Sequence, residues 1–154
     1  MYALRNLKRT DLSRCASLYV QTFNAKPWND HWTVPAARKR LQDILDTPGF
    51  YGLVITAGDN LIGAVLGNIE RWYDRHHYNL KEMFVQPDLQ GSGIGTRIMT
   101  RACGDLLKRN VLGIYLLTTT SGGVSRFYTK NHFKQAKGML MMSLKFPAQD
   151  RRSP

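Results

Sequence analysis

One glycine-rich segment, which reads VQPDLQGSGIGT from Val85 to Thr96, constrains the fold of this chain more than any other part. An apolar run ends at Val85, a turn containing proline follows, and glycines stand at positions 91, 93 and 95 directly before a helical pattern. A strand–turn–helix junction of this kind aims several backbone N–H groups at one point, where the helix dipole also favours anions. Because glycine has no Cβ, a phosphate can approach the backbone closely. The segment therefore predicts a cradle for a pyrophosphate.

The spacing of these glycines excludes two common nucleotide-binding motifs. The dinucleotide fingerprint GxGxxG needs its third glycine one position after Gly95. A P-loop needs GxxxxGK followed by serine or threonine, and the sequence contains no such run. The remaining pattern is QxxGxG, with Gln90, Gly93 and Gly95 at its fixed positions.

Apolar periodicity and turn residues predict the elements around this segment. Strands are expected at Tyr2–Asn6, Phe50–Ala57, Leu61–Trp72, Tyr78–Val85, Val111–Thr118, Phe133–Gln135 and Met139–Phe146. Helices are expected from a cap at Asp11 to about Phe23, from a cap at Thr33 to Thr47-Pro48-Gly49, from Ile94 to about Asn110, and from Ser121 to about Lys130. The strand–helix–strand–helix order of the second half implies partly parallel strands, and the hairpin residues Gly58-Asp59-Asn60 imply antiparallel ones. A mixed α/β sheet results.

Length and composition bound the chain further. Its 154 residues fit a single domain, predicted over residues 1–146, with a flexible tail at 147–154. No apolar stretch reaches the roughly 18–20 residues of a membrane span, and the first residues carry no signal-peptide core, so no membrane association is expected. Cys15 and Cys103 form neither a CxxC pair nor a disulfide framework, which favours a reducing, cytoplasmic location. The four histidines and two cysteines lack ligand spacing, so no metal site is predicted.

The charge of the chain is strongly basic. Its net charge is +11, and the residues after His77, with 12 basic and 4 acidic side chains, contribute +8 of this. Such a half favours a polyanionic partner, which could be nucleic acid, an anionic surface or a phosphate-rich cofactor, and it also suits a merely solubilising surface. The sequence has no RNP-type, zinc-finger or arginine-rich stretch, so a nucleic-acid partner is disfavoured.

With QxxGxG after a strand and a proline turn, the chain resembles the GCN5-related N-acetyltransferase (GNAT) superfamily. A second segment, RFYTKNHF from Arg126 to Phe133, is similar to the family's F-Y-x-x-x-G-F segment. Asn131 or His132 stands near the usual glycine, and asparagine tolerates the left-handed conformation expected there. The order of elements also matches. The resemblance implies the acyl-CoA N-acyltransferase fold: a mixed, mostly antiparallel sheet of six to seven strands flanked by about four helices, with the fourth and fifth strands splayed apart.

The resemblance implies that acetyl-CoA binds as cosubstrate in the opening between the strands Tyr78–Val85 and Val111–Thr118. Ser121 stands where the family often has an asparagine that contacts the pantetheine arm, and Lys130, Arg97 and Arg101 are candidates for screening phosphate charge. The cofactor-binding residues implied in this way are Met83, Phe84, Val85, Gln90, Gly91, Ser92, Gly93, Ile94, Gly95, Thr96, Ser121 and Lys130.

Two residues carry the predicted chemistry. The resemblance gives Tyr128 the role of protonating the leaving thiolate, which leaves better when partly protonated because its pKa is near 8.5; the alternative is a packed aromatic beside the sulfur. Glu82 resembles the acidic position of the family's E-x-[FY]-V strand ending and is the candidate general base. Strand alternation places Glu82 opposite Lys81 and Met83. The alternatives for the base are Glu70, Asp74, the pair His76 and His77, or a chain of waters.

The acceptor pocket is expected between the first two helices, the Asn24–Trp32 loop and the Trp72–Asn79 connection. Trp28, Trp72 and Asp74 are its predicted substrate-binding residues, because an aromatic wall with a few acids suits a small organic cation. The predicted function is transfer of an acetyl group from acetyl-CoA to a primary amine in a ternary complex, most simply on a small molecule. A protein N-terminal or lysine acceptor, and a non-catalytic acyl-CoA-binding module, remain open, as does a homodimer. The basic charge counts against polyamines and aminoglycosides unless the pocket is locally acidic.

Overall fold

The computed structural model describes residues 1–120 and 123–147. Within these residues the strands form one five-stranded sheet in the order β1-β2-β3-β4-β5, with antiparallel pairs up to β4 and a parallel β4–β5 pair. Two short 3-10 turns, Arg9–Asp11 and Pro87–Leu89, precede α1 and α3. The elements are β1 (Tyr2–Asn6), α1 (Leu12–Phe23), α2 (Val34–Leu45), β2 (Phe50–Ala57), β3 (Asn60–Arg71), β4 (His76–Val85), α3 (Ile94–Lys108), β5 (Val111–Tyr115) and α4 (Val124–Lys130).

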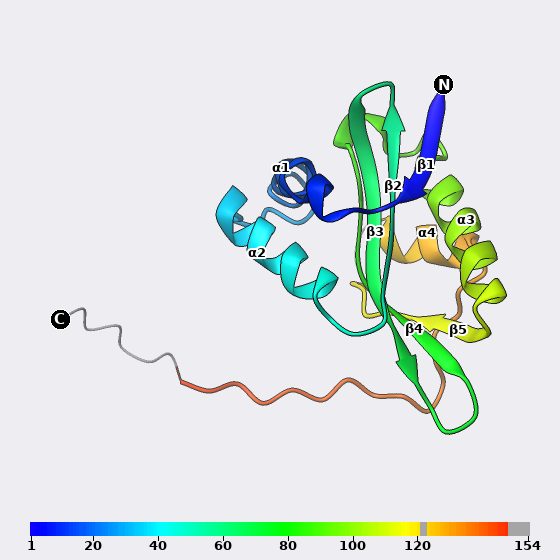
Figure 1. Cartoon of the computed structure of the whole chain (residues 1–154). Helices are drawn as coiled ribbons and strands as arrows, with labels where there is room; N and C mark the ends of the chain where they lie inside the picture. Colours follow the sequence, from blue (N-terminus) through cyan, green and yellow to red (C-terminus); the bar gives the residue numbers. More distant parts are fainter. Residues whose placement is uncertain (121–122, 148–154) are drawn as a thin grey trace.

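Helices cover both faces of this sheet. α1 and α2 lie on one face, and α3 and α4 lie on the other (Figure 1). Strand alternation divides β2 between the two cores, because Val54 packs with α1 and α2 whereas Leu53 and Ile55 pack with α3. The buried stripe of α3 repeats every four residues as Ile94, Ile98, Ala102 and Leu106.

Most of the predicted boundaries are confirmed. β1 and β2 have the predicted bounds, and α3 begins at Ile94. Thr33 caps α2, since its hydroxyl accepts a hydrogen bond from the Ala36 amide at 3.3 Å. β3, β4 and α3 differ from expectation by one or two residues at an end, which is the usual uncertainty of element termini. β5 ends at Tyr115, three residues before the predicted end at Thr118.

The two predicted closing strands are not formed. Phe133 instead packs against the α3-side core, and residues 139–147 follow as an irregular, exposed stretch. The described sheet therefore has five strands rather than the predicted six to seven. A strand needs a neighbouring strand for its backbone hydrogen bonds, and no described strand pairs with residues 133–147. Apolar alternation alone is therefore not enough to form a strand here.

The predicted helix cap at Asp11 is wrong in its chemistry. Asp11 precedes α1, but its side chain makes no cap hydrogen bond to that helix. Its carboxylate, only 1% exposed, instead accepts two hydrogen bonds from Arg5 at 2.7 and 2.8 Å and one from Arg14 at 2.7 Å. The Lys8 amide donates a further hydrogen bond at 2.9 Å. These contacts tie β1 to α1, and the hydrogen-bonded Arg5 guanidinium holds the pKa of Asp11 well below its usual range.

Replacing this carboxylate should destabilise the fold in a pH-dependent way. For Asp11→Asn, which keeps the volume but removes the charge, we expect the free energy of unfolding to fall by about 2 kcal/mol at neutral pH. Because the folded-state pKa is lowered, the ionised form stabilises the fold above the unfolded pKa of about 4. That advantage over the variant is lost as the pH falls through the lower folded-state pKa. Urea denaturation at several pH values measures both effects.

Asp46→Asn is the matched control, because Asp46 makes an exposed ion pair with Arg9. Its stability should stay close to that of the unaltered protein. Equal losses in the two variants would contradict the role given to Asp11.

Candidate functional site

The glycine motif forms the turn that joins β4 to α3. The Leu89 amide donates to the Gln86 carbonyl at 2.9 Å, which closes the 3-10 turn. The side-chain amide of Gln90 donates to the Val85 carbonyl at 3.1 Å. The motif glutamine therefore fastens the turn to the end of β4 with its own side chain.

Two of the three glycines are required by their backbone conformation. Gly91 and Gly93 have φ values of 78° and 86°, in the left-handed region that other residues rarely adopt. A Cβ at either position would meet no atom within 4 Å, so both face open space. The first helical hydrogen bond of α3 runs from the Arg97 amide to the Gly93 carbonyl at 3.0 Å. The amides from Gly93 to Thr96 therefore precede the bonded part of the helix, and this arrangement suits an anion.

The third glycine allows close packing between helices. A Cβ on Gly95 would lie 2.9 Å from Cε2 of the Phe127 ring in α4. The first turn of α3 and the helix that carries Tyr128 are therefore in direct contact.

The predicted splay between the fourth and fifth strands is present beside this turn. The residues of β4 that pair with β5 are His76–Asn79, opposite Val111–Tyr115. From Leu80 to Val85, β4 pairs in the described chain only with β3, on its other edge. One backbone edge of Met83, Phe84 and Val85 thus has no strand partner and leads directly into the glycine turn.

A β-bulge orients Glu82. The β3–β4 register shifts between Leu66 and Gly67, so that Lys81 is an extra residue in β4. Because of this shift, Leu80 and Met83 both pack on the α3 side, although strict alternation would separate them. Glu82 lies on the opposite face from Met83, as predicted, and points toward α2.

Arg40 of α2 is a site residue that the sequence did not indicate. Its Nη2 and Nε lie 2.9 and 3.0 Å from Oε1 of Glu82. The Glu82 side chain is 11% exposed and that of Arg40 is 45% exposed. Burial raises the pKa of Glu82 above its ordinary value, and the hydrogen-bonded Arg40 opposes this rise without cancelling it. A carboxylate whose pKa is raised in this way is a stronger base than an exposed one.

Tyr128 lies within electrostatic reach of Glu82. Burial, together with the negative charge of Glu82, raises the pKa of Tyr128 to about 12. The ring is fixed by edge-on contacts with Phe127 and Phe133, at centroid distances of 5.1 and 5.3 Å. His132, with φ of 68°, takes the left-handed position that follows α4, whereas Asn131 does not. The negative charge of Glu82 therefore acts on Tyr128, and Tyr128 keeps its proton at neutral pH.

An aromatic cluster lies beside this pair, between α1, the loop after it and β4. Tyr19 packs edge-on against Trp32 and Phe84, at centroid distances of 5.2 and 5.4 Å. Phe23 packs against Trp28 at 5.5 Å. Asp30 accepts a hydrogen bond from the Trp32 indole at 3.1 Å, and its charge also acts on Glu82. The predicted substrate-binding residue Trp28 thus joins the aromatic cluster through Phe23, and Asp30 is the acid of this cluster that acts on Glu82.

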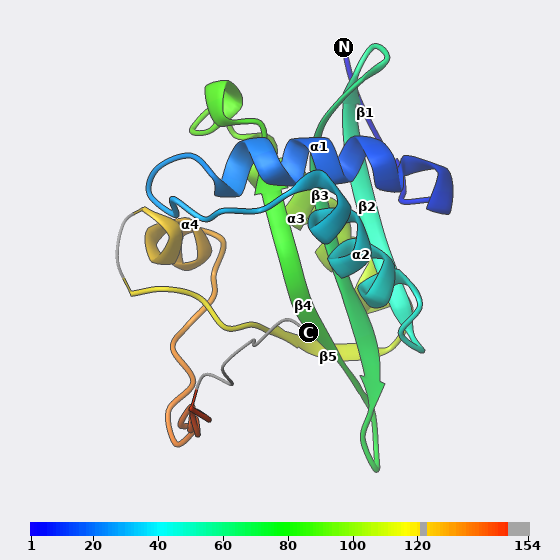
Figure 2. The ribbon, with the colours of Figure 1, turned by 90° about the vertical axis from the view of Figure 1, so that its left-hand side faces the viewer.

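Trp72 and Asp74 lie elsewhere. They belong to the β3–β4 turn, which extends away from the α1–α2 loop at the far end of β4 (Figure 2). Trp72 is 57% exposed and packs against His77, near the start of β4, roughly 20 Å along the strand from Phe84. Glu70, an alternative base, is at this far end too, where hydrogen bonds from Tyr115 at 2.6 Å and Asn79 at 3.1 Å lower its pKa.

The remaining predicted cofactor residues are placed as follows. Ser121 lies outside the described residues. Lys130 is exposed at the end of α4. Arg97 lies over the Tyr2 ring and Arg101 pairs with Asp105, so both are engaged on the β1 side of α3.

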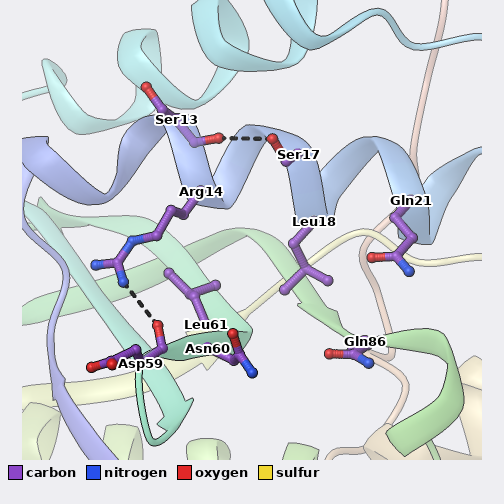
Figure 3. A pocket seen from close by; sticks show the side chains of 9 residues that line it. All are labelled: Ser13, Arg14, Ser17, Leu18, Gln21, Asp59, Asn60, Leu61 and Gln86. Atoms are coloured by element: carbon purple, nitrogen blue, oxygen red, sulfur yellow. Dashed lines mark hydrogen bonds between the residues drawn. The ribbon is translucent and has the colours of Figure 1, made fainter.

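A separate polar hollow of about 440 Å³ lies between α1 and the β2–β3 turn. Figure 3 shows its walls, with Ser17 and Gln21 on α1, Asp59 on the turn, Asn60 at the start of β3 and Gln86 just after β4. Arg14 crosses it to the Asp59 carbonyl at 3.2 Å. The hollow includes none of the predicted site residues.

In the described chain, no group of three or more His, Cys, Asp or Glu side chains is arranged to hold a metal ion. Over the same residues, no helix has the length and apolarity needed to cross a membrane.

Comparisons with known proteins identify the family of the chain. The model of the acetyltransferase (GNAT) family matches residues 12–133. An uncharacterized N-acetyltransferase of Methanocaldococcus jannaschii is 27% identical over 160 residues, which cover 92% of this chain and 66% of that protein. This chain therefore spans just under two thirds of the length of that relative.

Solved structures share the fold at low identity. A possible acetyltransferase from Clostridium difficile 630 has a TM-score of 0.79 at 13% identity, over 96% of this chain and 99% of its own. An aminoglycoside acetyltransferase from an uncultured soil metagenomic sample, solved with sisomicin, has a TM-score of 0.70 at 14% identity, over 94% and 97%. Since the family model spans most of its length, this chain belongs to the acetyltransferase (GNAT) family.

Proposed function

We propose that this protein transfers the acetyl group of acetyl-CoA to the primary amine of a small molecule, by direct attack in a ternary complex. The observation that carries the proposal is the arrangement of three features around one opening. The unpaired edge of β4 and the free amides at the start of α3 form its rim. Tyr128 and Glu82 are the titratable groups beside it, and the negative charge of Glu82 acts on the Tyr128 hydroxyl.

Each feature has a role in the proposed reaction. The amides from Gly93 to Thr96 bind the pyrophosphate, and the edge of Met83 to Val85 binds the acetyl and pantetheine amide groups. The amine nitrogen attacks the thioester carbonyl carbon, so a C–N bond forms and the C–S bond breaks. The amine proton passes to Glu82, whose raised pKa suits a general base. Tyr128 donates its proton to the sulfur as negative charge develops there.

The surroundings of Glu82 support an amine cation as the acceptor. Asp30 and Glu82 supply negative charge, and Trp28 supplies an aromatic face for a cation. Arg40 forms an ion pair with Glu82, so this carboxylate can bind a cationic group. Trp72 and Asp74 stay predictions, and only an acceptor long enough to follow β4 would contact them as well as Trp28.

Gly93→Val tests the pyrophosphate cradle. A branched side chain there meets an unfavourable φ and enters the open space in front of the amides. We expect acetyl-CoA affinity, measured by isothermal titration calorimetry, to fall by about 100-fold or more, the effect of losing roughly 3 kcal/mol of binding. Gly104→Ala is the control, because a Cβ on this α3 glycine also meets no atom but lies away from the turn. Unchanged affinity in Gly93→Val would refute the cradle.

Tyr128→Phe tests the leaving-group role, in a CoA-release assay over small amines, amino acids, aminoglycosides and peptides. We expect kcat to fall by about 100-fold while acetyl-CoA affinity stays the same, because the ring remains and only the donor is lost. Tyr73→Phe, at a tyrosine 97% exposed on the β3–β4 turn, should match the unaltered enzyme.

The same assay separates the alternatives. Release only with peptides would indicate a protein acceptor. Acetyl-CoA binding without release on any amine would indicate a non-catalytic module, and an unaltered rate in Tyr128→Phe would remove its acid role.

The pH profile of kcat/KM tests Glu82 and Arg40. The base must be ionised, so activity should rise with pH through the raised pKa of Glu82. Arg40→Met removes the guanidinium that lowers the pKa of Glu82. This variant should therefore shift the rising part (the ascending limb) of the pH profile to higher pH. Glu82→Gln should abolish the limb and lower kcat by about 100-fold. Arg38→Met, at an exposed arginine on the same helix, should leave the profile in place. An ascending limb that persists in Glu82→Gln would point to a water chain as the base.

A further inference from the structure

The outer edge of β1 is open in the described chain. β1 pairs with β2 on one side, and no described strand lies on its other side. The Leu7 amide donates to the Gly52 carbonyl at 2.9 Å, so the backbone groups of Arg5, two residues earlier, also face β2. Because these groups alternate along a strand, the N–H and C=O of Leu4 point away from β2. Such an edge can pair with a further strand.

A basic groove runs beside this edge. A hollow of about 670 Å³ lies between β1 and α3, with Leu4 on the strand side. The exposed cations of α3 that line it are Arg97, Arg101 and Lys108. Asp105 is the acidic residue among those that line it. Figure 1 shows α3 next to β1, on the opposite face of the sheet from α1 and α2. The groove therefore presents an excess of positive charge beside an open strand edge.

The cations of this groove have donors left for a ligand. Arg101 holds the Asp105 carboxylate with its Nε alone, at 2.9 and 3.0 Å. Its two terminal nitrogens bond to no group of the described chain, so they can bind a second carboxylate. Arg97 and Lys108 form no ion pair with any described residue. The Arg97 guanidinium lies over the Tyr2 ring, 5.7 Å from its centroid.

The edge and the groove have similar dimensions. The five residues of β1 span about 17 Å at 3.4 Å per residue. The stretch of α3 from Arg97 to Lys108 rises about 16 Å at 1.5 Å per residue. Arg97 and Arg101 are about 6 Å apart along the helix axis, and alternate side chains of an extended strand are about 7 Å apart. A strand paired with β1 and acidic at alternate positions would therefore bring successive carboxylates to successive cations.

We propose that the open edge of β1 and the basic groove together bind an acidic, extended segment of another protein, which adds a strand to the sheet. Backbone pairing along β1 supplies affinity, and the cations of α3 select acidic side chains. A nucleic acid fits less well, because it has no amide groups at strand spacing. The ring that could stack with a base, Tyr2, is covered by Arg97. This inference does not depend on the proposed activity.

A synthetic peptide that alternates Glu and Thr tests the site on the full chain. We expect it to bind with a Kd of about 100 μM or tighter at low salt, measured by fluorescence anisotropy. A peptide of the same composition with all Glu residues in one block should bind far more weakly, and one that alternates Lys and Thr should not bind. Hydrogen exchange followed by NMR should show that the acidic peptide protects the Leu4 amide. The Arg5 amide, already facing β2, should change little.

Two matched double variants separate the groove from the overall charge of the chain. Arg101→Gln with Lys108→Gln should weaken binding of the alternating Glu peptide by about tenfold or more, because the groove loses two of its cations. Arg38→Gln with Lys39→Gln lowers the net charge equally, but at exposed positions of α2 on the other face of the sheet. It should change the affinity by less than about twofold.

Several results would overturn the proposed site. Equal losses in the two double variants would mean that net charge alone attracts the peptide. Binding that leaves the Leu4 amide unprotected, equal binding of the block peptide, or no binding of the alternating Glu peptide would each remove the strand pairing. Protection of Leu4 that grows with protein concentration in the absence of peptide would assign the edge to a second copy instead. Tighter binding of duplex DNA than of the peptide would assign the groove to nucleic acid.

Discussion

The arrangement of the site depends on one strand, β4, having strand partners on both edges for only part of its length. Among residues 1–120 and 123–147, no strand pairs with the β5 edge of β4 beyond Asn79, although β3 continues on the other side. Buried backbone groups need hydrogen-bond partners, so an edge left open inside a sheet invites a ligand with amide groups of its own. The glycine turn follows Val85 at once and continues the same line with free amides. In the proposed function, the strand edge and the helix start together bind an elongated molecule with an amide-rich arm and a charged end.

The ion pair between Arg40 and Glu82 governs the charge at the other side of this opening. Burial alone would favour the neutral carboxyl group, and the guanidinium favours the ionised one. An arriving ammonium group can replace the guanidinium without leaving the carboxylate uncompensated, because each supplies a positive charge with N–H donors. The ion pair with Arg40 therefore gives Glu82 the same charge environment that the proposed amine acceptor would give it. Arg40, nearly half exposed, has room to move toward solvent during such a replacement.

Sequence reasoning succeeded where local backbone requirements determine the structure. The positive φ at Gly91 and Gly93, and the contact at Gly95, leave a pattern that only glycine satisfies, so the turn could be located without coordinates. Arg40 could not be identified, because nothing distinguishes it from Arg38 and Lys39 until the fold brings β4 alongside α2. The grouping of Trp72 with Trp28 rested on residue chemistry alone. Trp72 lies in the turn before β4, whereas Trp28 lies in the α1–α2 loop, near the other end of that strand. The strands expected after α4 required a neighbour that the described chain does not provide.

The contact at Gly95 links the two ends of the chemistry. The amides proposed to bind the pyrophosphate and the tyrosine proposed to protonate the sulfur belong to different helices. The Phe127 ring of α4 nevertheless packs directly on the first turn of α3, at Gly95, which has no side chain. The distance between the amides at the start of α3 and the Tyr128 hydroxyl is therefore determined by the packing of Phe127 on Gly95 and not by a loop. In the proposed reaction, a ligand whose pyrophosphate and thioester are separated by a different length could not reach both groups at once. The close packing at Gly95 would therefore select the length of the arm that joins them.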